Sequence, residues 1–178
     1  MARKTIFVLV LCILALSCVY AGKSSIVIQG SPFSFQSVSI PSGDYYSTYG
    51  YGARAGYRYG VSNNFSVGGD FDLSIFKFNE LENNYMIMAL RAVLGYRFDI
   101  SSIIYAKCEL GAGVAVRSIG DKRQAVADLQ ADIDAGFRIS DSFAITVGLG
   151  LELGFQEKKS ASSTDFAVKT EVGLDISL

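Results

Sequence analysis

Hydrophobic and polar residues alternate one by one along most of the chain, from Thr48 onward. In one segment, for example, Ala106 and Cys108 alternate with Lys107 and Glu109. A period of two is typical of a β-strand, whose successive side chains point to opposite faces, whereas a helix repeats about every 3.6 residues. The pattern therefore predicts a chain built of strands.

The segment 25–40 is the least regular of the series. Ile26 and Phe33 fall in opposite phases, and Pro32 lies between them. A proline at such a point suggests a β-bulge, because a bulge inserts one extra residue and reverses the phase of the strand. With this segment counted as a strand, the sequence predicts eight strands.

The expected connections between these strands alternate in length. Positions 62–64, 99–102 and 140–142 are expected to form tight turns, whereas 41–47, 79–84, 118–125 and 156–164 are expected to form longer polar loops. Short turns at one end of a sheet and loops at the other are typical of transmembrane barrels.

The residue types on each face indicate which face points inward. Most of the 18 glycines fall in the polar phase, together with long Arg, Lys and Glu side chains. Eight strands enclose an interior just wide enough for side chains to fill, so long polar side chains need glycine beside them. The apolar face is too extensive for a small soluble barrel to enclose, and the segments are long enough to cross a membrane as tilted strands.

Aromatic residues in the apolar phase gather near both ends of the strands, where amphipathic rings prefer the lipid headgroup level. The fold predicted is all-β, an eight-stranded antiparallel up-and-down transmembrane β-barrel. The alternative is a soluble exported barrel with an apolar, ligand-binding cavity. The predicted aromatic girdle comprises Tyr57, Tyr59, Tyr96, Phe98 and Phe143 toward the turns, and Tyr49, Tyr51, Phe155 and Phe166 toward the loops.

The first residues have the composition of a secretory signal peptide. Arg3 and Lys4 precede an apolar stretch, and the small residue Ala21 ends a cleavage pattern. We expect residues 1–21 to be a signal peptide and residues 22–178 to be an outer-membrane β-barrel domain. The alternatives are an uncleaved membrane anchor and a lipoprotein acylated at Cys18. After cleavage at Ala21 only Cys108 remains, so no internal disulfide can form.

Together, the signal sequence, the eight alternating segments and the terminal strand resemble the small outer-membrane barrels of the OmpX, OmpW, opacity-protein and OmpA-barrel type. The resemblance implies a location in the cell outer membrane of a diderm bacterium, contact with outer-membrane lipid, and insertion by the barrel-assembly machinery. That group typically ends in Phe, and Leu178 stands in its place here.

Charged residues in the polar phase are nearly balanced, which predicts an ion-pair network in the lumen, since an unpaired buried charge costs several kcal/mol. A three-residue turn at 62–64 would place residues directly opposite each other when their residue numbers sum to 126. Three pairs are expected on this basis and from the next hairpin: Arg54 with Asp72, Arg58 with Asp70, and Arg91 with Glu109.

The composition points away from catalysis. The chain contains no His, the commonest general base and a common metal ligand, and outer-membrane acyltransferases and proteases of similar architecture use a His-containing site. Asp128, Asp132 and Asp134 share one strand face, which suits either a metal or acid–base site or an ion-paired wall. We expect these aspartates to form ion pairs along the lumen wall, and we expect no catalytic residue, no metal and no cofactor. The net charge of −1 gives no indication of nucleic-acid binding, so we expect no nucleic-acid partner.

These observations predict a structural or surface-interaction protein, adhesin-like, with a side-chain-filled lumen. The segments 118–125 and 156–160 are candidate contact points for a host, matrix or lipopolysaccharide-like partner, and the alternative for both is a solvated linker. A second candidate function, suggested by the resemblance to OmpW-type proteins, is a narrow passage for a small solute.

Overall fold

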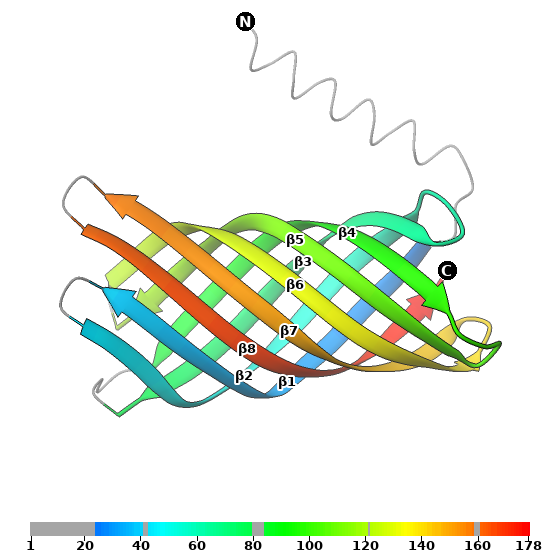
Figure 1. Ribbon diagram of the computed structural model, residues 1–178, viewed down its shortest axis with the longest axis horizontal. Coiled ribbons are helices and arrows are strands. Elements are labelled where there is room, and N and C mark those ends of the chain that lie inside the picture. The colour runs from blue at the N-terminus through cyan, green and yellow to red at the C-terminus, as the bar shows by residue number, and fades with distance from the viewer. Residues whose placement is uncertain (1–23, 41–42, 80–83, 121, 159–160) are drawn as a thin grey trace, which may run out of the picture.

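The computed structural model describes residues 24–40, 43–79, 84–120, 122–158 and 161–178. The expected signal peptide and Cys18 lie outside these residues. Eight strands close into a barrel in sequence order, and β1 pairs with β8 in antiparallel fashion (Figure 1). Their bounds are β1 Ser24–Ile40, β2 Gly43–Gly60, β3 Phe65–Phe78, β4 Tyr85–Asp99, β5 Ile104–Ile119, β6 Lys122–Ser140, β7 Phe143–Lys158 and β8 Ala161–Ser177.

The predicted fold class, an eight-stranded antiparallel up-and-down transmembrane β-barrel, is confirmed. Every neighbouring pair of strands is antiparallel, and no strand crosses over another. Within the described ranges, no helix is long and apolar enough to span a membrane.

The predicted irregularity in the first strand is also present. The pairing of β1 shifts against β2 between Ser31 and Ser34, and against β8 between Gly30 and Phe33. Pro32 lies inside both shifts, where a residue without a backbone N–H does not interrupt a ladder. The two halves of β1 can therefore both direct their apolar side chains outward.

The long loops predicted at one end of the barrel are mostly absent, and this prediction was wrong. β1 continues to Ile40 before β2 begins at Gly43, β5 continues to Ile119 before β6 begins at Lys122, and β7 and β8 are separated by residues 159–160. Only residues 79–84 form a longer connection at that end. Polar residues continue the strand pairing there, because the strands are longer than the about 9–11 residues that a membrane requires.

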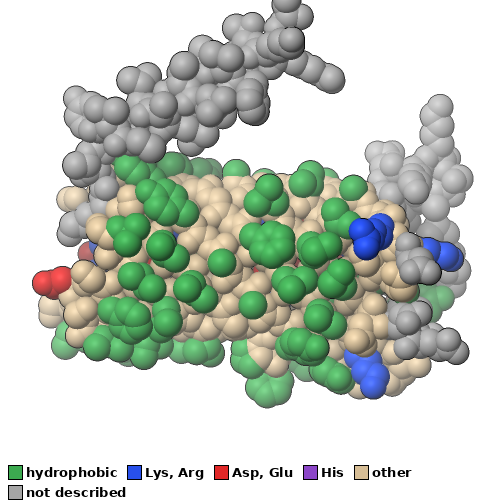
Figure 2. All heavy atoms as spheres, turned by 180° about the vertical axis from the view of Figure 1, so that it is seen from behind, with side chains coloured by type: hydrophobic (Ala, Val, Ile, Leu, Met, Phe, Trp, Pro, Cys, Tyr) green, Lys and Arg blue, Asp and Glu red, His purple; other side chains and the backbone are tan. Residues whose placement is uncertain are grey.

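The barrel has its apolar side outside. Leu90, Leu110 and Ile133 are 63%, 63% and 66% exposed, and Figure 2 shows hydrophobic side chains spread over the outer wall. Buried polar and charged residues outnumber buried hydrophobic ones among the described positions. Such an arrangement suits a protein whose outer surface meets lipid and whose interior is polar.

One glycine shows how little room the interior leaves. Tyr105 of β5 is 2% exposed and lies directly opposite Gly136 of β6. A Cβ atom at position 136 would collide with the Tyr105 ring. The guanidinium carbons of Arg97 and Arg138 lie 5.5 and 5.3 Å from the centre of the same ring, so the ring is held between two cations.

We therefore expect Gly136→Ala to destabilise the barrel by about 1–3 kcal/mol, because the added methyl group overpacks the site of the Tyr105 ring. Urea unfolding in lipid vesicles, followed by the heat-modifiable shift on gels, measures the loss. Gly30→Ala is the matched control, since the nearest atom to its added Cβ, the Val172 carbonyl oxygen, is 3.9 Å away. Equal losses in the two variants would contradict the packing argument.

Candidate functional site

Arg54 of β2 lies at the centre of the lumen network and is 2% exposed. Its Nη1 atom forms an ion pair with Asp132 of β6, and its Nη2 atom lies 3.1 Å from Glu171 Oε2 on β8. Its Nε atom donates a 2.8 Å hydrogen bond to Gln29 of β1. One guanidinium thus joins four strands across the barrel.

A second centre joins the other side of the lumen. Arg91 of β4 binds Asp128 of β6 through Nε and lies 3.0 Å from Glu152 of β7. Lys169 of β8 lies 2.6 Å from the same Glu152 and 3.0 Å from Asp72 of β3. Each cation is therefore shared between carboxylates on different strands, which is the geometry that offsets the desolvation of buried charge.

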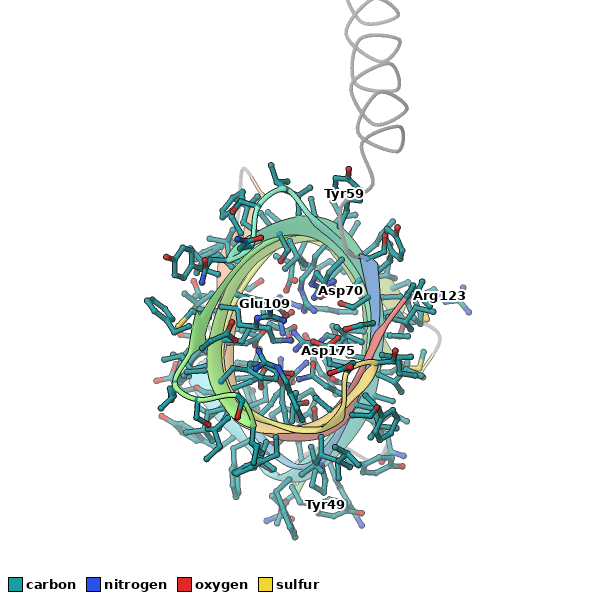
Figure 3. The ribbon with its side chains drawn as sticks, turned by 90° about the vertical axis from the view of Figure 1, so that its right-hand side faces the viewer. Tyr49, Tyr59, Asp70, Glu109, Arg123 and Asp175 are labelled. Carbon is teal, nitrogen blue, oxygen red and sulfur yellow. The ribbon has the colours of Figure 1, made fainter. Side chains whose placement is uncertain are left out.

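A third group lies toward the short turns. Arg58 Nε is 2.8 Å from Glu109 Oε1, and Arg58 Nη2 is 3.3 Å from Asp70 Oδ2. Lys107 Nζ is 3.5 Å from Glu109 and 3.4 Å from Asp134. With this group, all eight strands contribute to one connected network, and Figure 3 shows Asp70 and Glu109 directed into the barrel.

Glycines on the inward face leave room for the long charged side chains to cross the lumen. Gly113 of β5 pairs with Arg91 on one side and with Asp128 on the other. The Arg91 side chain passes close to the neighbouring Gly111, where its Cδ atom would lie 3.2 Å from an added Cβ. An added Cβ at position 113 would collide with the Leu90 carbonyl oxygen, so a side chain there would displace the β4 backbone that carries Arg91.

The register predicted from the turn is present, and one expected ion pair follows it. The backbone of Arg54 lies opposite that of Asp72 in the β2–β3 hairpin, so residues whose numbers sum to 126 are indeed opposite each other. Arg58 reaches Asp70, as expected for its diagonal neighbour.

Two expected partners are replaced by others. Asp72 is bound by Lys169, and Arg54 extends past it to Asp132. Arg91 binds Asp128, while Glu109, which pairs in register with Gly95, is bound by Arg58 instead. The reason is length: an arginine side chain reaches beyond its hairpin neighbour, about 5 Å away, to carboxylates across the narrow lumen.

Several interior residues were missed. Among the described residues, nine buried carboxylates exceed six buried cations. Gln29, Gln36 and Gln130 donate hydrogen bonds to Asp134, Asp165 and Asp132. Asp165 lies four positions before Lys169, so the alternation along the strand places both side chains on the inward face and could have predicted Asp165 as an interior residue. An apolar cluster also lies inside the barrel near the loop end: Phe76, Phe78, Tyr85, Ile87, Ala89, Ala115, Val126 and Ala167.

The nine aromatic residues predicted to form girdles all lie on the outer wall. Tyr59 and Phe143 are half-buried, and the other seven are exposed. Figure 3 shows Tyr49 and Tyr59 directed away from the lumen. Their contact with lipid headgroups stays a prediction.

Two cavities lie at opposite ends of the lumen. One, of about 400 Å³, is lined by residues near the loop end, including Val38, Phe78 and Arg117. The other, of about 620 Å³, is polar and is lined by residues near the turns, including Arg97 and Asp99. The ion-pair network lies between them, and part of the apolar cluster, including Phe78 and Tyr85, lines the first cavity.

The three aspartates of β6 are engaged with cations. Asp128 binds Arg91, Asp132 binds Arg54, and Asp134 lies 3.4 Å from Lys107 Nζ. In the part of the chain that the structure describes, no three His, Cys, Asp or Glu residues are grouped so as to hold a metal ion.

Comparison with known proteins identifies the fold. No protein-family model and no curated protein sequence matches the chain. The structure is similar to Neisserial surface protein A, with 13% sequence identity, a TM-score of 0.63, and coverage of 87% of this chain and 98% of that one. It is also similar to the outer membrane protein OprG from Pseudomonas aeruginosa, with 8% identity, a TM-score of 0.51, and coverage of 88% and 97%. The chain thus has the fold of the small eight-stranded outer-membrane barrels.

The cross-lumen geometry gives a test of the network. Arg54→Met should destabilise the barrel by about 3–5 kcal/mol, because it leaves buried carboxylates without their cation. In that background Asp132→Asn should restore roughly 0.5–3 kcal/mol, since the two residues are directly coupled. Urea unfolding in lipid vesicles measures each step.

Asp72→Asn in the same Arg54→Met background is the control. It should restore nothing and should add to the loss, because it removes the partner of Lys169. If Asp72→Asn rescues the Arg54 variant better than Asp132→Asn does, the hairpin pairing is the true one and the cross-lumen assignment fails.

Proposed function

We propose that the protein is an integral outer-membrane barrel with a closed lumen that serves as a structural or surface-interaction protein. The observation that carries this proposal is the network itself, which fills the middle of the barrel with paired side chains. Arg54, Arg91 and Lys169 are each less than 4% exposed. A lumen closed in this way suits anchoring and contact better than diffusion.

The contact surface we propose is the rim at the loop end. Lys77, Lys122 and Arg123 are exposed there, and Figure 2 shows Lys and Arg side chains gathered at that end of the barrel. Because most of the connections are short, the rim consists of hairpin ends and not of long loops. A cationic rim of this kind favours an anionic partner, such as the phosphates of outer-leaflet lipid or an acidic host surface polymer.

Export through a cleaved signal peptide and insertion by the barrel-assembly machinery belong to the same proposal. The basic start, the apolar stretch and the small residue at position 21 support export. The loop end would then face the outside and the short turns the periplasm, as in other barrels of this class.

Planar-bilayer recording tests the closed lumen. We expect the purified protein to show at most small, sporadic conductance. Removing one buried pair with Arg91→Ala and Asp128→Ala should raise the conductance, since both side chains leave the lumen while the charge stays balanced. A large, steady conductance from the unaltered protein would favour the passage for a small solute and refute the closed lumen.

Labelling of single cysteines tests location and orientation, in a Cys108→Ser background. Arg123→Cys at the loop end should react on intact cells with a maleimide that cannot cross the outer membrane. Ser142→Cys in the β6–β7 turn should react only after the membrane is opened. The reverse order would invert the proposed orientation, and release of the protein by osmotic shock without detergent would exclude the membrane location.

A further inference from the structure

The cavity at the loop end is an apolar cup inside the barrel mouth. It has a volume of about 400 Å³, within the usual range for small-molecule sites. Val38, Phe78 and Ile119 line it, and the Phe78 ring meets the Tyr85 ring edge-on with centres 5.7 Å apart. These side chains belong to four strands, so the cup is part of the barrel wall.

A polar pair lies deeper in the same cavity. Arg117 Nη1 is 2.7 Å from Asp165 Oδ2, and the two residues are 6% and 3% exposed. The Tyr85 hydroxyl and the Gln36 amide also donate to Asp165 Oδ2, at 2.7 and 3.2 Å. All the described contacts of the Asp165 carboxylate thus converge on one of its two oxygens.

The other atoms of this pair have no hydrogen-bond partner among the described residues. They are Arg117 Nε, a donor, and Asp165 Oδ1, an acceptor, and both are buried. A buried polar atom without a partner costs about 1–3 kcal/mol, so native sites normally satisfy such atoms. Here one donor and one acceptor of the same ion pair line a cavity whose walls are mostly apolar.

Apolar side chains lie between the cavity and the membrane centre. Phe76, Ile87, Ala89 and Ala115 belong to the buried apolar cluster near this end, and the ion-pair network lies beyond that cluster. A molecule that enters the mouth would therefore meet the Arg117–Asp165 pair before the apolar cluster and the network, as suits a binding site.

We propose that this cavity binds a neutral amphiphile, a molecule with a hydrocarbon body and one uncharged amide head. An amide presents an acceptor to Arg117 Nε and a donor to Asp165 Oδ1, while its hydrocarbon packs against Phe78, Val38 and Ile119. A carboxylate head would meet the charge of Asp165, and an ammonium head would meet that of Arg117. The neutral pair therefore selects against both kinds of ion.

Photo-crosslinking in lipid nanodiscs tests the site. The probe is decanamide that carries a diazirine on its chain, compared with decanoate and decylamine that carry the same diazirine. We expect decanamide to label the peptides that contain Phe78 and Tyr85, and the two charged analogues to label them about tenfold less. Equal labelling by all three would overturn the proposal, because the polar pair would then have no selective role.

Two tryptophan variants separate the cavity from the surrounding lipid. Ile119→Trp fills the mouth and should reduce labelling about tenfold, whereas Val116→Trp, on the outward face of the same strand, should leave it within about twofold. Both variants are first checked for the heat-modifiable, folded form. Equal labelling in the two would show that the probe reacts from the bilayer, and would refute the site.

One further variant tests the selectivity itself. Asp165→Asn leaves the Arg117 charge without its partner, so decanoate should now label better than decylamine and should gain relative to decanamide. An unchanged order of labelling in this variant would refute the role assigned to the pair. The closed lumen does not depend on this result, because the network lies beyond the apolar cluster.

Discussion

The structure depends on one constraint: a barrel of eight strands is too narrow to hydrate the charges it encloses. Each interior charge must be neutralised by another side chain, because a buried charge without a partner costs several kcal/mol. Arg54, Arg91 and Lys169 meet this requirement by each binding carboxylates on two other strands. The same contacts tie non-neighbouring strands together, so the pairing that satisfies the charges also fixes the barrel in cross-section.

That constraint also explains where the glycines lie. An arginine that crosses the lumen needs open backbone beside it, and the Arg91 side chain passes close to Gly111. Gly and Arg occur together on one face of a strand because the glycines leave the space that the arginine side chains occupy. Gly136 leaves space for the ring of Tyr105 in the same way.

The architecture could be predicted from the sequence because alternation with a period of two is a local property, and the glycine-rich polar face indicated that this face points inward. The register of β2 with β3 followed in the same way from a turn. The ion-pair partners did not, because they depend on which strands face one another across the lumen, and Arg54 reaches Asp132 from 78 residues away. Polar composition at 118–125 predicts a loop, but β5 and β6 both continue into this segment, since strands that extend beyond the membrane can be polar on both faces. Gly120, with φ of 55°, is the residue that allows the tight turn there.

The lumen is therefore layered, and each layer has a different chemical character. The polar cavity at the turn end leads to a network in which every strand contributes a charge or an amide. An apolar cluster follows toward the loop end, and its Phe78 and Tyr85 line the cup there. Carboxylates exceed cations in the buried set, and the amides of Gln29, Gln36 and Gln130 donate hydrogen bonds where a further cation would otherwise be needed. Asp165 is the buried carboxylate that lines the cavity at the loop end, and its Oδ1 has no hydrogen-bond partner among the described residues. The charged groups in the middle of the barrel lie against one another, whereas at the mouth a donor and an acceptor without hydrogen-bond partners among the described residues line a cavity together with apolar side chains, so we assign recognition of a small molecule to the mouth.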